Sequence, residues 1–325
     1  METVPLGQTD LKVSRVAFGA WELGGEWGSV RTDAAIAAIR QARNLGINLF
    51  DTAQGYGFGA SERLVAAALR DDLDHSRSEV LIATKGGLRL TPDGLVRDSS
   101  PAWLRRGVDE SLDALGVEYV DLYQVHWPDP AVPFEETAGA LHELVTAGKI
   151  RHVGVSNFDT DQMTAFGSTW PVETLQLPYH LFRRGAAHDL LPYCSRHNIG
   201  VLAYGTLAHG LLTGTMRTDT TFAGDDWRHA SPIFQGDSFA RNLEVVSALQ
   251  SLAAELGVTV SQLAIAWVLD NPAVTTAIVG TRSADHVAES VAGAELTLKD
   301  ADRTGIDQVM ARAVPIGGPS PEAMP

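Results

Sequence analysis

Four residues that lie far apart in the chain could together form a proton-donating tyrosine. Asp51, Lys85 and His126 each directly follow a short hydrophobic segment, and Tyr56 comes shortly after Asp51. A tyrosine is a poor acid near neutral pH, because its free pKa is ~10. A buried lysine beside it favours the phenolate, and a carboxylate can hold that lysine in place. We therefore expect Tyr56 to act as a general acid that Lys85 and Asp51 make more acidic.

The segments before these residues belong to a regular alternation of predicted strands and helices. The predicted strands are short, rich in β-branched or aromatic residues, and stopped by Gly, Pro, Asp or Asn. They cover Val16–Gly19, Ile47–Phe50, Val80–Thr84, Val120–Val125, His152–Val155, Thr174–Leu177, Val201–Tyr204 and Thr276–Val279. Helical patterns lie between them at residues 32–46, 100–116, 133–147, 159–166 and 187–198. Such an alternation indicates parallel βαβ units.

Eight strands of this kind favour a closed (β/α)8 TIM barrel, which typically needs ~250 residues, over an open sheet. The 325 residues therefore predict a single α/β barrel domain, spanning residues 1–325, with insertions. In this fold the active site lies where the strands end and the following loops begin. Asp51, Lys85 and His126 follow the second, third and fourth predicted strands, so the predicted fold and the predicted chemistry support each other.

Two regions depart from the alternation. Residues 3–14 predict a small N-terminal hairpin that turns at Gly7–Asp10. After the seventh strand, residues 205–240 form a long Gly-, Thr- and Asp-rich loop, and loops of that length are often functional lids. Two helical patterns then follow in succession, at Arg241–Leu256 and Ser261–Leu269, which predicts an extra helix.

The composition limits the partners and the compartment of the protein. With 25 basic and 40 acidic residues the net charge is −15, which argues against nucleic acid or an anionic membrane as a partner. No segment reaches the roughly 18 consecutive apolar residues of a membrane helix, and Met1–Pro5 lacks the features of a signal peptide. The single cysteine, Cys194, excludes an internal disulfide and suits a reducing compartment. We therefore expect a cytoplasmic protein.

One glycine-rich segment partly matches a dinucleotide-binding fingerprint. Gly55–Ala60 follows a predicted strand and precedes a helix. The fingerprint also requires an acidic residue at the end of the next strand, where Lys85 stands, whereas Glu79 opens that strand. Tyr56 and Phe58 are bulky where a backbone should approach phosphate. We therefore interpret the segment as the loop that carries Tyr56, not as a Rossmann phosphate loop.

Several motifs, in order along essentially the whole chain, resemble those of the aldo-keto reductases. They are Asp51–Tyr56, Gly59–Glu62, Ala83–Lys85, Gln124–Asp129, Gly148–Phe158 and Gly210–Gly214. Tyr56–Gly59, His126–Asp129 and Ser320–Pro325 resemble the bacterial branch that contains general-stress and inositol-operon reductases. The resemblance implies a barrel that binds NADPH across its mouth without a Rossmann domain. It also implies that hydride passes from the nicotinamide to a carbonyl carbon, that Tyr56 protonates the alkoxide and that His126 orients the carbonyl.

The resemblance further implies which residues contact the cofactor. They are Ser156, Asn157, Gln176, Tyr204, Gly205, Leu207, His209, Gly210, Gly280, Arg282 and His286. Ser156, Asn157 and Gln176 match residues that bond the nicotinamide carboxamide, and Tyr204 matches the aromatic residue that stacks on the nicotinamide. Arg282 stands where a basic residue binds the 2′-phosphate, which favours NADPH over NADH.

Several positions depart from the family pattern, and one departure is Gly205–Leu207, where the family commonly has Ser-Pro-Leu. His209 stands where a basic residue is common, so we expect it to bind pyrophosphate only when protonated and cofactor affinity to fall between about pH 6 and 8. His286 and Ser290 replace a Gln and an Asn at the adenine site, which weakens adenine contacts more than phosphate contacts. The loop at residues 205–240 is expected to close over the cofactor.

The substrate is expected to be a small carbonyl compound. Trp21 and Trp127 are expected to wall the pocket, and Trp27 and Phe58 can join them, which suits small aldehydes, α-dicarbonyls or aromatic carbonyls. No metal is expected, because the histidines form no set of ligands at strand ends. The expected oligomeric state is a monomer or a weak homo-oligomer. The alternatives are an NADPH-binding sensor, as in the potassium-channel β-subunits of this superfamily, and another barrel enzyme such as a metal-dependent isomerase.

Overall fold

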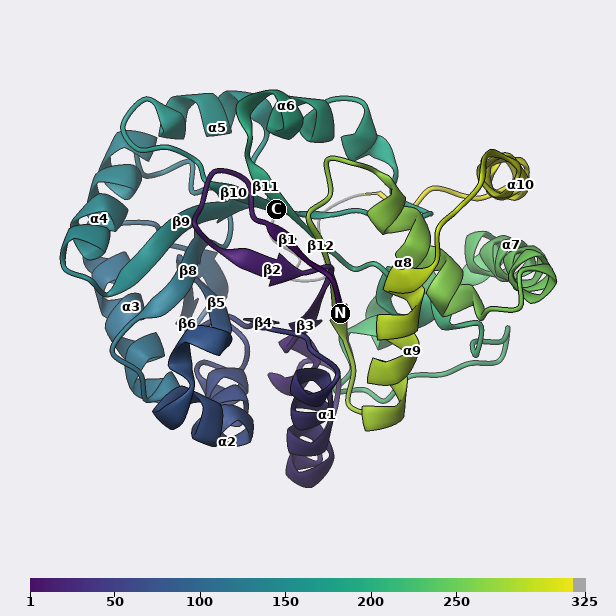
Figure 1. Ribbon diagram of the computed structural model, residues 1–325, viewed down its shortest axis with the longest axis horizontal. Helices are drawn as coiled ribbons and strands as arrows, with labels where there is room; N and C mark the ends of the chain where they lie inside the picture. The colour runs from purple at the N-terminus through teal and green to yellow at the C-terminus, as the bar shows by residue number, and fades with distance from the viewer. Residues whose placement is uncertain (318–325) are drawn as a thin grey trace.

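In a computed structural model that describes residues 1–317, eight parallel strands form a closed barrel surrounded by helices (Figure 1). The strands are β3 (Val16–Gly19), β4 (Leu49–Asp51), β5 (Leu81–Gly86), β8 (Val120–Val125), β9 (Ile150–Ser156), β10 (Thr174–Pro178), β11 (Gly200–Tyr204) and β12 (Thr276–Gly280). The barrel closes where β3 pairs with β12, with Gly19 opposite Gly280. Each predicted strand overlaps an observed one, and the predicted (β/α)8 barrel is confirmed.

Helices cover the outside of the barrel. They are α1 (Thr32–Asn44), α2 (Ala60–His75), α3 (Pro101–Leu115), α4 (Phe134–Thr146), α5 (Thr160–Gly167), α6 (Leu190–His197), α8 (Val260–Asp270) and α9 (Ala284–Glu295). Helix α3 shows how local sequence sets such boundaries. The Ser100 side chain accepts a hydrogen bond from the Trp103 N–H, Pro101 is the first helical residue, and Gly116 ends the helix with φ +63°. Helix α9 was not predicted.

The predicted N-terminal hairpin is confirmed and covers one end of the barrel (Figure 1). It consists of β1 (Thr3–Pro5) and β2 (Lys12–Ser14), which pair antiparallel. Leu6 and Leu11 from its loop belong to the same buried cluster as Leu49 and Leu122 of the barrel strands. The hairpin thus completes the apolar interior of the barrel at this end.

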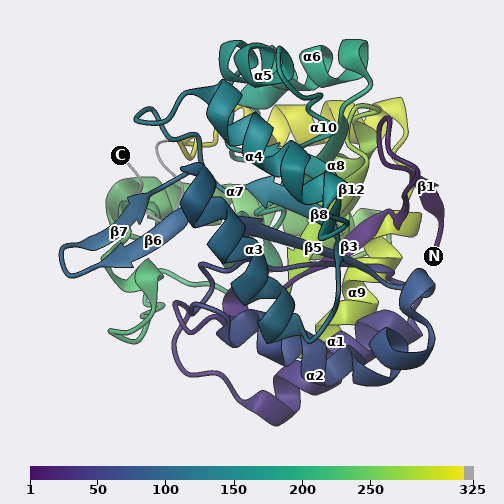
Figure 2. The ribbon, with the colours of Figure 1, turned by 90° about the vertical axis from the view of Figure 1, so that its left-hand side faces the viewer.

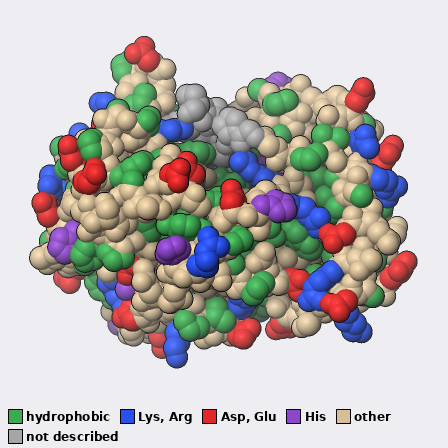
Figure 3. All heavy atoms as spheres, turned by 90° about the horizontal axis from the view of Figure 1, so that it is seen from above, with side chains coloured by type: hydrophobic (Ala, Val, Ile, Leu, Met, Phe, Trp, Pro, Cys, Tyr) green, Lys and Arg blue, Asp and Glu red, His purple; other side chains and the backbone are tan. Residues whose placement is uncertain are grey.

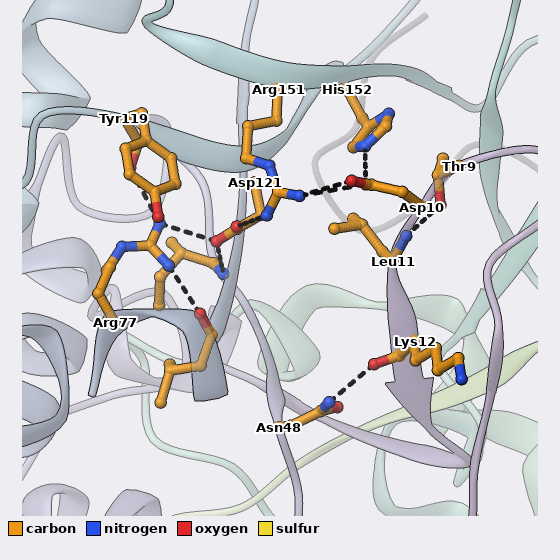
Figure 4. A network of polar contacts seen from close by, with 12 residues as sticks. Thr9, Asp10, Leu11, Lys12, Asn48, Arg77, Tyr119, Asp121, Arg151 and His152 are labelled. Carbon is orange, nitrogen blue, oxygen red and sulfur yellow. Dashed lines mark hydrogen bonds and ion pairs between the residues drawn. The ribbon is translucent and has the colours of Figure 1, made fainter.

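A network of ion pairs fastens the hairpin to the strands (Figure 4). Asp10, in the hairpin turn, accepts hydrogen bonds from Arg151 and His152 near the start of β9. Arg151 also contacts Asp121, whose fully buried carboxylate binds Arg77 on its other oxygen. These residues lie at the end of the barrel where strands begin, where polar networks usually serve stability rather than catalysis.

A second hairpin was not predicted. It consists of β6 (Leu88–Thr91) and β7 (Gly94–Arg97) and lies between β5 and α3 in the chain. It projects from the end of the barrel opposite to the N-terminal hairpin (Figure 2). The run Pro92–Gly94 at its tip is a strong turn signal, from which the hairpin could have been predicted.

The long loop after β11 contains short 3₁₀ segments before the extra helix begins. These segments are Ala208–Thr213, Trp227–Ala230 and Pro232–Phe234, and they are followed by α7 (Gly236–Glu255). Leu211, Leu212 and Phe234 are buried with residues of α7 and α8 in a second apolar cluster. The predicted extra helix is confirmed as α7, whereas α10 (Asp300–Met310), which packs on α7, was not predicted.

Three further points concern possible membrane spans, the charge of one face and the last motif of the sequence. Within residues 1–317 no single helix is long and apolar enough to cross a membrane, and α7 and α8 reach that threshold only together, by length and composition, with an 87° bend. On the face shown in Figure 3, acidic and basic side chains are mixed, and the described residues there form no extended patch of one sign. The motif Ser320–Pro325 lies outside the described residues.

Candidate active site

A cavity of about 470 Å³ opens where the barrel strands end. Asp51, Tyr56 and His126 line this cavity, as does Trp21. The cavity is also lined by all the residues predicted to contact the cofactor, namely Ser156, Asn157, Gln176, Tyr204, Gly205, Leu207, His209, Gly210, Gly280, Arg282 and His286. The fold therefore brings the predicted catalytic and cofactor residues to one site.

The floor of the cavity holds a buried lysine between a carboxylate and a phenol. Lys85 is fully buried, and its Nζ donates to Asp51 Oδ2 at 2.7 Å, to the Thr52 carbonyl at 2.8 Å and to Tyr56 Oη at 3.2 Å. The ammonium group has three protons, so these contacts satisfy it completely. A cation at this distance from the phenol favours the phenolate over the neutral form.

A turn rich in glycine presents Tyr56 to this lysine. Gly57 has φ +61°, and a Cβ on it would lie 2.3 Å from the Gly24 carbonyl oxygen. Only glycine fits such a close approach with a left-handed backbone. The glycines of Gly55–Ala60 thus shape a turn, which agrees with their interpretation as the Tyr56 loop. Phe58 is exposed and does not line the cavity.

His126 lies beside Tyr56, with the two ring centroids 5.5 Å apart and nearly perpendicular. Burial lowers the pKa of His126 well below its usual value, and the charge of Lys85 lowers it further. The imidazole is therefore neutral at physiological pH. A neutral imidazole has one N–H donor and one acceptor, which allows it to hold a carbonyl oxygen by a hydrogen bond.

Polar residues at the ends of β9 and β11 form a hydrogen-bonded chain beside the tyrosine. Tyr204 Oη donates to Asn157 Oδ1 at 2.9 Å. Asn157 Nδ2 in turn donates to the His126 carbonyl and to Ser156 Oγ, both at 3.1 Å. Asn157 has φ +64°, a conformation that asparagine tolerates better than most residues. The chain fixes the positions of three of the predicted nicotinamide contacts.

Two predicted substrate residues have different surroundings. Trp21 lines the cavity and stacks on Trp227, with the ring centroids 6.0 Å apart and an interplanar angle of 19°. Trp127 instead packs in a small buried cluster with Leu88 beneath the β6–β7 hairpin, and Arg97 lies over its ring. Trp127 is not among the residues that line the cavity, so the structure brings Trp21, and not Trp127, to the predicted catalytic residues.

Trp21, Trp27 and Trp227 form an aromatic group, here called the tryptophan cluster, that joins the loop after β3 to the loop after β11. Their ring centroids lie 4.9 to 6.0 Å apart. A β-bridge between Trp27 and Asp226 also connects the two loops. Sequence reasoning missed Trp227, although an aromatic residue in a loop otherwise rich in Gly, Thr and Asp was a signal for it.

The structure contradicts the expected titration of His209. Its ring lies against all three rings of the tryptophan cluster, and the residue is only 9% exposed. Burial, and to a smaller extent the charges of Arg183 and Arg228, lower the pKa of His209 to about 3. The side chain is therefore neutral from pH 6 to 8 and cannot act as a pH-dependent cation there.

Two charged residues of the cavity were missed by sequence reasoning. Arg228, from the loop after β11, and Glu22, from the loop after β3, both line it. Burial raises the pKa of Glu22, although the charges of Arg282 and Arg228 oppose that shift. Arg282, the predicted 2′-phosphate ligand, donates to the carbonyls of Trp27 and Ser29 at 3.3 and 3.2 Å.

Comparison with known proteins establishes the family. The Aldo/keto reductase family model matches residues 15–311, and the chain belongs to this family. Aldo-keto reductase YhdN of Bacillus subtilis is 40% identical, over 98% of this chain and 96% of the relative. NADH-specific methylglyoxal reductase of Escherichia coli is 34% identical, over 94% and 97% of the two chains. The protein is accordingly an NAD(P)H-dependent oxidoreductase of carbonyl compounds.

Solved structures agree with this assignment. The glycerol dehydrogenase AKR11B4 from Gluconobacter oxydans superposes with a TM-score of 0.87, at 40% identity, and the alignment covers 98% of each chain. An aldo-keto reductase from Klebsiella pneumoniae in complex with NADPH has a TM-score of 0.75 at 29% identity, with 97% of this chain and 96% of that one covered. That complex supports the expectation of a nicotinamide dinucleotide in the same barrel.

Proposed function

We propose that this protein is an NADPH-dependent carbonyl reductase in which Tyr56 donates the proton that converts an aldehyde or ketone to its alcohol. The observation that carries the proposal is the contact of 3.2 Å between Lys85 Nζ and Tyr56 Oη at the floor of the cavity. Lys85 has no exposed surface, and Asp51 is its buried counterion. A buried ion pair directed at a phenol in a cavity is better explained by catalysis than by stability, to which such pairs contribute little.

The chain's own residues hold the carbonyl oxygen and supply a proton to it. NADPH, when bound, supplies the hydride that adds to the carbonyl carbon. Lys85 stabilises the phenolate, so Tyr56 releases its proton to the developing alkoxide more readily. Neutral His126, next to Tyr56, donates a hydrogen bond to the same oxygen and orients it. The reaction is reversible, because the phenolate can accept the proton back from the alcohol.

The donors along the cavity fit a phosphorylated dinucleotide. At the catalytic end, Ser156 and Asn157 provide a hydroxyl and an amide suited to a carboxamide. At the β12 end, the guanidinium of Arg282 suits a phosphate dianion, which NADPH has and NADH lacks. We therefore propose NADPH as the preferred cofactor, although the Escherichia coli relative is named as NADH-specific.

Substitution of Tyr56 by phenylalanine tests the proposal. We expect Tyr56→Phe to bind NADPH with an unchanged Kd, because the cofactor contacts remain, and to lose roughly 10²- to 10⁴-fold in kcat on methylglyoxal or 4-nitrobenzaldehyde. If the kcat of Tyr56→Phe equalled that of the wild type, Tyr56 would be excluded as the proton donor. Tight NADPH binding by the wild type, without turnover on a broad panel of carbonyls, would instead favour the sensor.

A further inference from the structure

A carboxylate outside the cavity contacts the turn that carries Tyr56. Glu26 lies in the loop after β3 and is not among the described residues that line the cavity. Its Oε1 accepts a hydrogen bond of 3.0 Å from the Gly57 N–H. Because Gly57 directly follows Tyr56 in the chain, this bond acts on the backbone next to the proposed proton donor. Glu26 can therefore influence Tyr56 from outside the space for substrate and cofactor.

This bond anchors the Gly57 amide. Within residues 1–317 no other acceptor bonds the Gly57 N–H. Gly57 has φ +61°, and glycine, which lacks a Cβ, changes its backbone conformation more easily than any other residue. The shape of the turn at Gly57 thus depends on contacts with neighbouring segments, and the side chain of Glu26 supplies one of them.

The backbone of the loop after β3 also packs directly on the turn. A Cβ on Gly24 would lie 2.8 Å from the Tyr56 carbonyl carbon, and closer still to Glu26 Oε2. Only glycine allows such a close approach at this position. The Glu26 side chain therefore folds back over Gly24 to reach the Gly57 N–H.

Glu26 is itself held by the loop after β11. Its carbonyl accepts a hydrogen bond of 3.1 Å from the Trp227 N–H, and the next residue, Trp27, forms the β-bridge to Asp226. The side chains of Trp27 and Trp227 also pack against each other in the tryptophan cluster. A side chain can position another residue only if its own backbone is fixed, and these contacts fix the backbone of Glu26.

The carboxylate of Glu26 is poorly paired for a group that serves stability alone. Among the described residues, its Oε2 is buried and has no hydrogen-bond partner. Burial raises the pKa of Glu26, and hydrogen bonds from its own N–H and that of Gly57 only partly offset this effect. A carboxylate oxygen that is buried without a donor lowers stability. A role in catalysis therefore explains this carboxylate better than a role in stability.

We propose that Glu26 is a positioning residue that holds the Tyr56 turn through the Gly57 N–H and thereby keeps Tyr56 Oη beside Lys85 Nζ. This inference rests on the proposed function, in which Tyr56 donates the proton. Because Glu26 does not line the cavity, its loss should slow proton transfer and leave cofactor binding unchanged. A displacement of a reacting group by about 1 Å is enough to cost ~10²-fold in rate.

Two substitutions of Glu26 test the proposal. Glu26→Ala removes the acceptor and should lower kcat on 4-nitrobenzaldehyde roughly 10- to 100-fold, while the Kd of NADPH stays unchanged. Glu26→Gln keeps an oxygen that can accept from the Gly57 N–H and should retain most of the wild-type kcat. Thermal melting checks the folding of both variants. If Glu26→Ala is unstable, Glu26→Leu, which fills the space but accepts no hydrogen bond, takes its place.

The pH dependence of the rate distinguishes positioning from a general loosening of the loop. The reduction needs protonated Tyr56, so the rate of a single turnover, followed by NADPH absorbance, should fall at alkaline pH where the phenol ionises. A longer contact with Lys85 favours the phenolate less. In Glu26→Ala this fall should therefore move to higher pH than in the wild type, whereas in Glu26→Gln it should not move.

The control and the contrary outcomes separate this inference from the proposed function. Glu118, exposed in the turn between α3 and β8, offers the control Glu118→Ala, which should change neither kcat nor its pH dependence. If Tyr56→Phe is impaired but folded Glu26→Ala has the wild-type kcat, Glu26 does not position Tyr56. Equal losses of kcat in Glu26→Ala and Glu26→Gln, with no change in pH dependence, would also overturn the inference. If Tyr56→Phe kept the wild-type kcat, the proposed function would fail, and this inference with it.

Discussion

Gln176 Nε2 donates a hydrogen bond of 2.8 Å to Asp51 Oδ1, which leaves Oδ2 to Lys85 at 2.7 Å. The carboxylate of β4 is therefore held from both sides, by an amide from β10 and an ammonium from β5. Because both oxygens are occupied, Asp51 cannot rotate without breaking a buried hydrogen bond. Gln176 was expected to contact the nicotinamide, which stays a prediction, and the structure shows that it fixes the counterion of Lys85.

Removal of Lys85 should therefore affect stability and catalysis together. Lys85→Met leaves Asp51 as a buried charge without a cation, which should cost about 3–5 kcal/mol in the free energy of unfolding. It also removes the cation beside Tyr56, so kcat should fall at least ~10²-fold. The double variant Lys85→Met/Asp51→Asn removes both charges and should recover much of the stability without recovering activity. Urea denaturation and carbonyl turnover of the two variants check this, and a double variant with near-normal kcat would refute it.

The parts of the fold that depend on local signals were predictable from sequence. Ser100–Pro101 and Gly116 mark the ends of α3 through caps that need only neighbouring residues. The strands that end at Asp51 and Lys85 were recognisable because buried parallel strands are short apolar runs. Their alternation with helices then implied the barrel, and the barrel implied that the residues after the strands meet.

The parts that depend on long-range packing were not predictable. Trp21 and Trp127 look alike in the sequence, since each follows a strand end, yet only Trp21 reaches the cavity. The difference is the β6–β7 hairpin, which covers Trp127 with Leu88 and Arg97. Likewise, the low pKa of His209 follows from burial among rings that are distant in sequence, and no motif at His209 indicates that burial.

The neutral state of His209 predicts that its substitution will not change the pH dependence of cofactor binding. With a pKa of about 3, the side chain does not titrate between pH 6 and 8. The ratio of the NADPH Kd of His209→Gln to that of the wild type should therefore be constant across this range. Fluorescence titrations at several pH values measure the ratio. A ratio that grows steadily toward pH 6 would show that His209 is protonated when the cofactor binds.

The carboxylate of Glu22 should oppose cofactor binding. It lines the cavity with Arg228 and Arg282, and a Cβ on Gly280 would lie 3.2 Å from its Oε1. An anion at this place repels the cofactor phosphates, so Glu22→Gln should tighten NADPH binding by roughly three- to tenfold. Because burial raises the pKa of Glu22, the wild type loses this charge as pH falls, and the tighter binding of NADPH by Glu22→Gln, relative to the wild type, should then shrink.

The exposed Glu244 offers a matched control, Glu244→Gln, which should leave the Kd unchanged. Weaker NADPH binding by Glu22→Gln would mean that the carboxylate instead accepts a hydrogen bond from the cofactor.

Cys194 should be inert in the folded protein. It lies fully buried on α6, and burial raises the pKa of its thiol to about 12. At pH 8 only ~10⁻⁴ of the thiol is ionised, and the thiolate is the form that reacts. We expect no reaction with a disulfide reagent such as 5,5′-dithiobis(2-nitrobenzoate) in native buffer, and a single thiol to react after unfolding in guanidinium. Rapid labelling of the native protein would mean that α6 opens readily.

His152, at the end of the barrel where the strands begin, should make the stability of the protein depend on pH. Its Nδ1 bonds Glu173 and its Nε2 bonds Asp10, both at 2.7 Å (Figure 4 shows the Asp10 contact). Burial lowers the pKa of His152, but the hydrogen bonds and charges of Glu173 and Asp10 outweigh it, so the pKa is raised above 6.5. The folded protein therefore holds this proton more tightly than the unfolded chain does.

The sign of the pH effect follows from that raised pKa. The contribution of His152 to stability is fully present below its unfolded pKa of ~6.5 and is lost as pH rises through the folded value. His152→Gln should therefore lower the melting temperature most near pH 6 and progressively less at pH 8 and above. The same change at His75, which is 73% exposed, serves as the control and should have little effect at either pH. If His152→Gln destabilised the protein more at pH 8 than at pH 6, the imidazole would have to be neutral in the folded state. Only one of Glu173 and Asp10 could then accept a hydrogen bond from the ring, because a neutral imidazole has a single N–H.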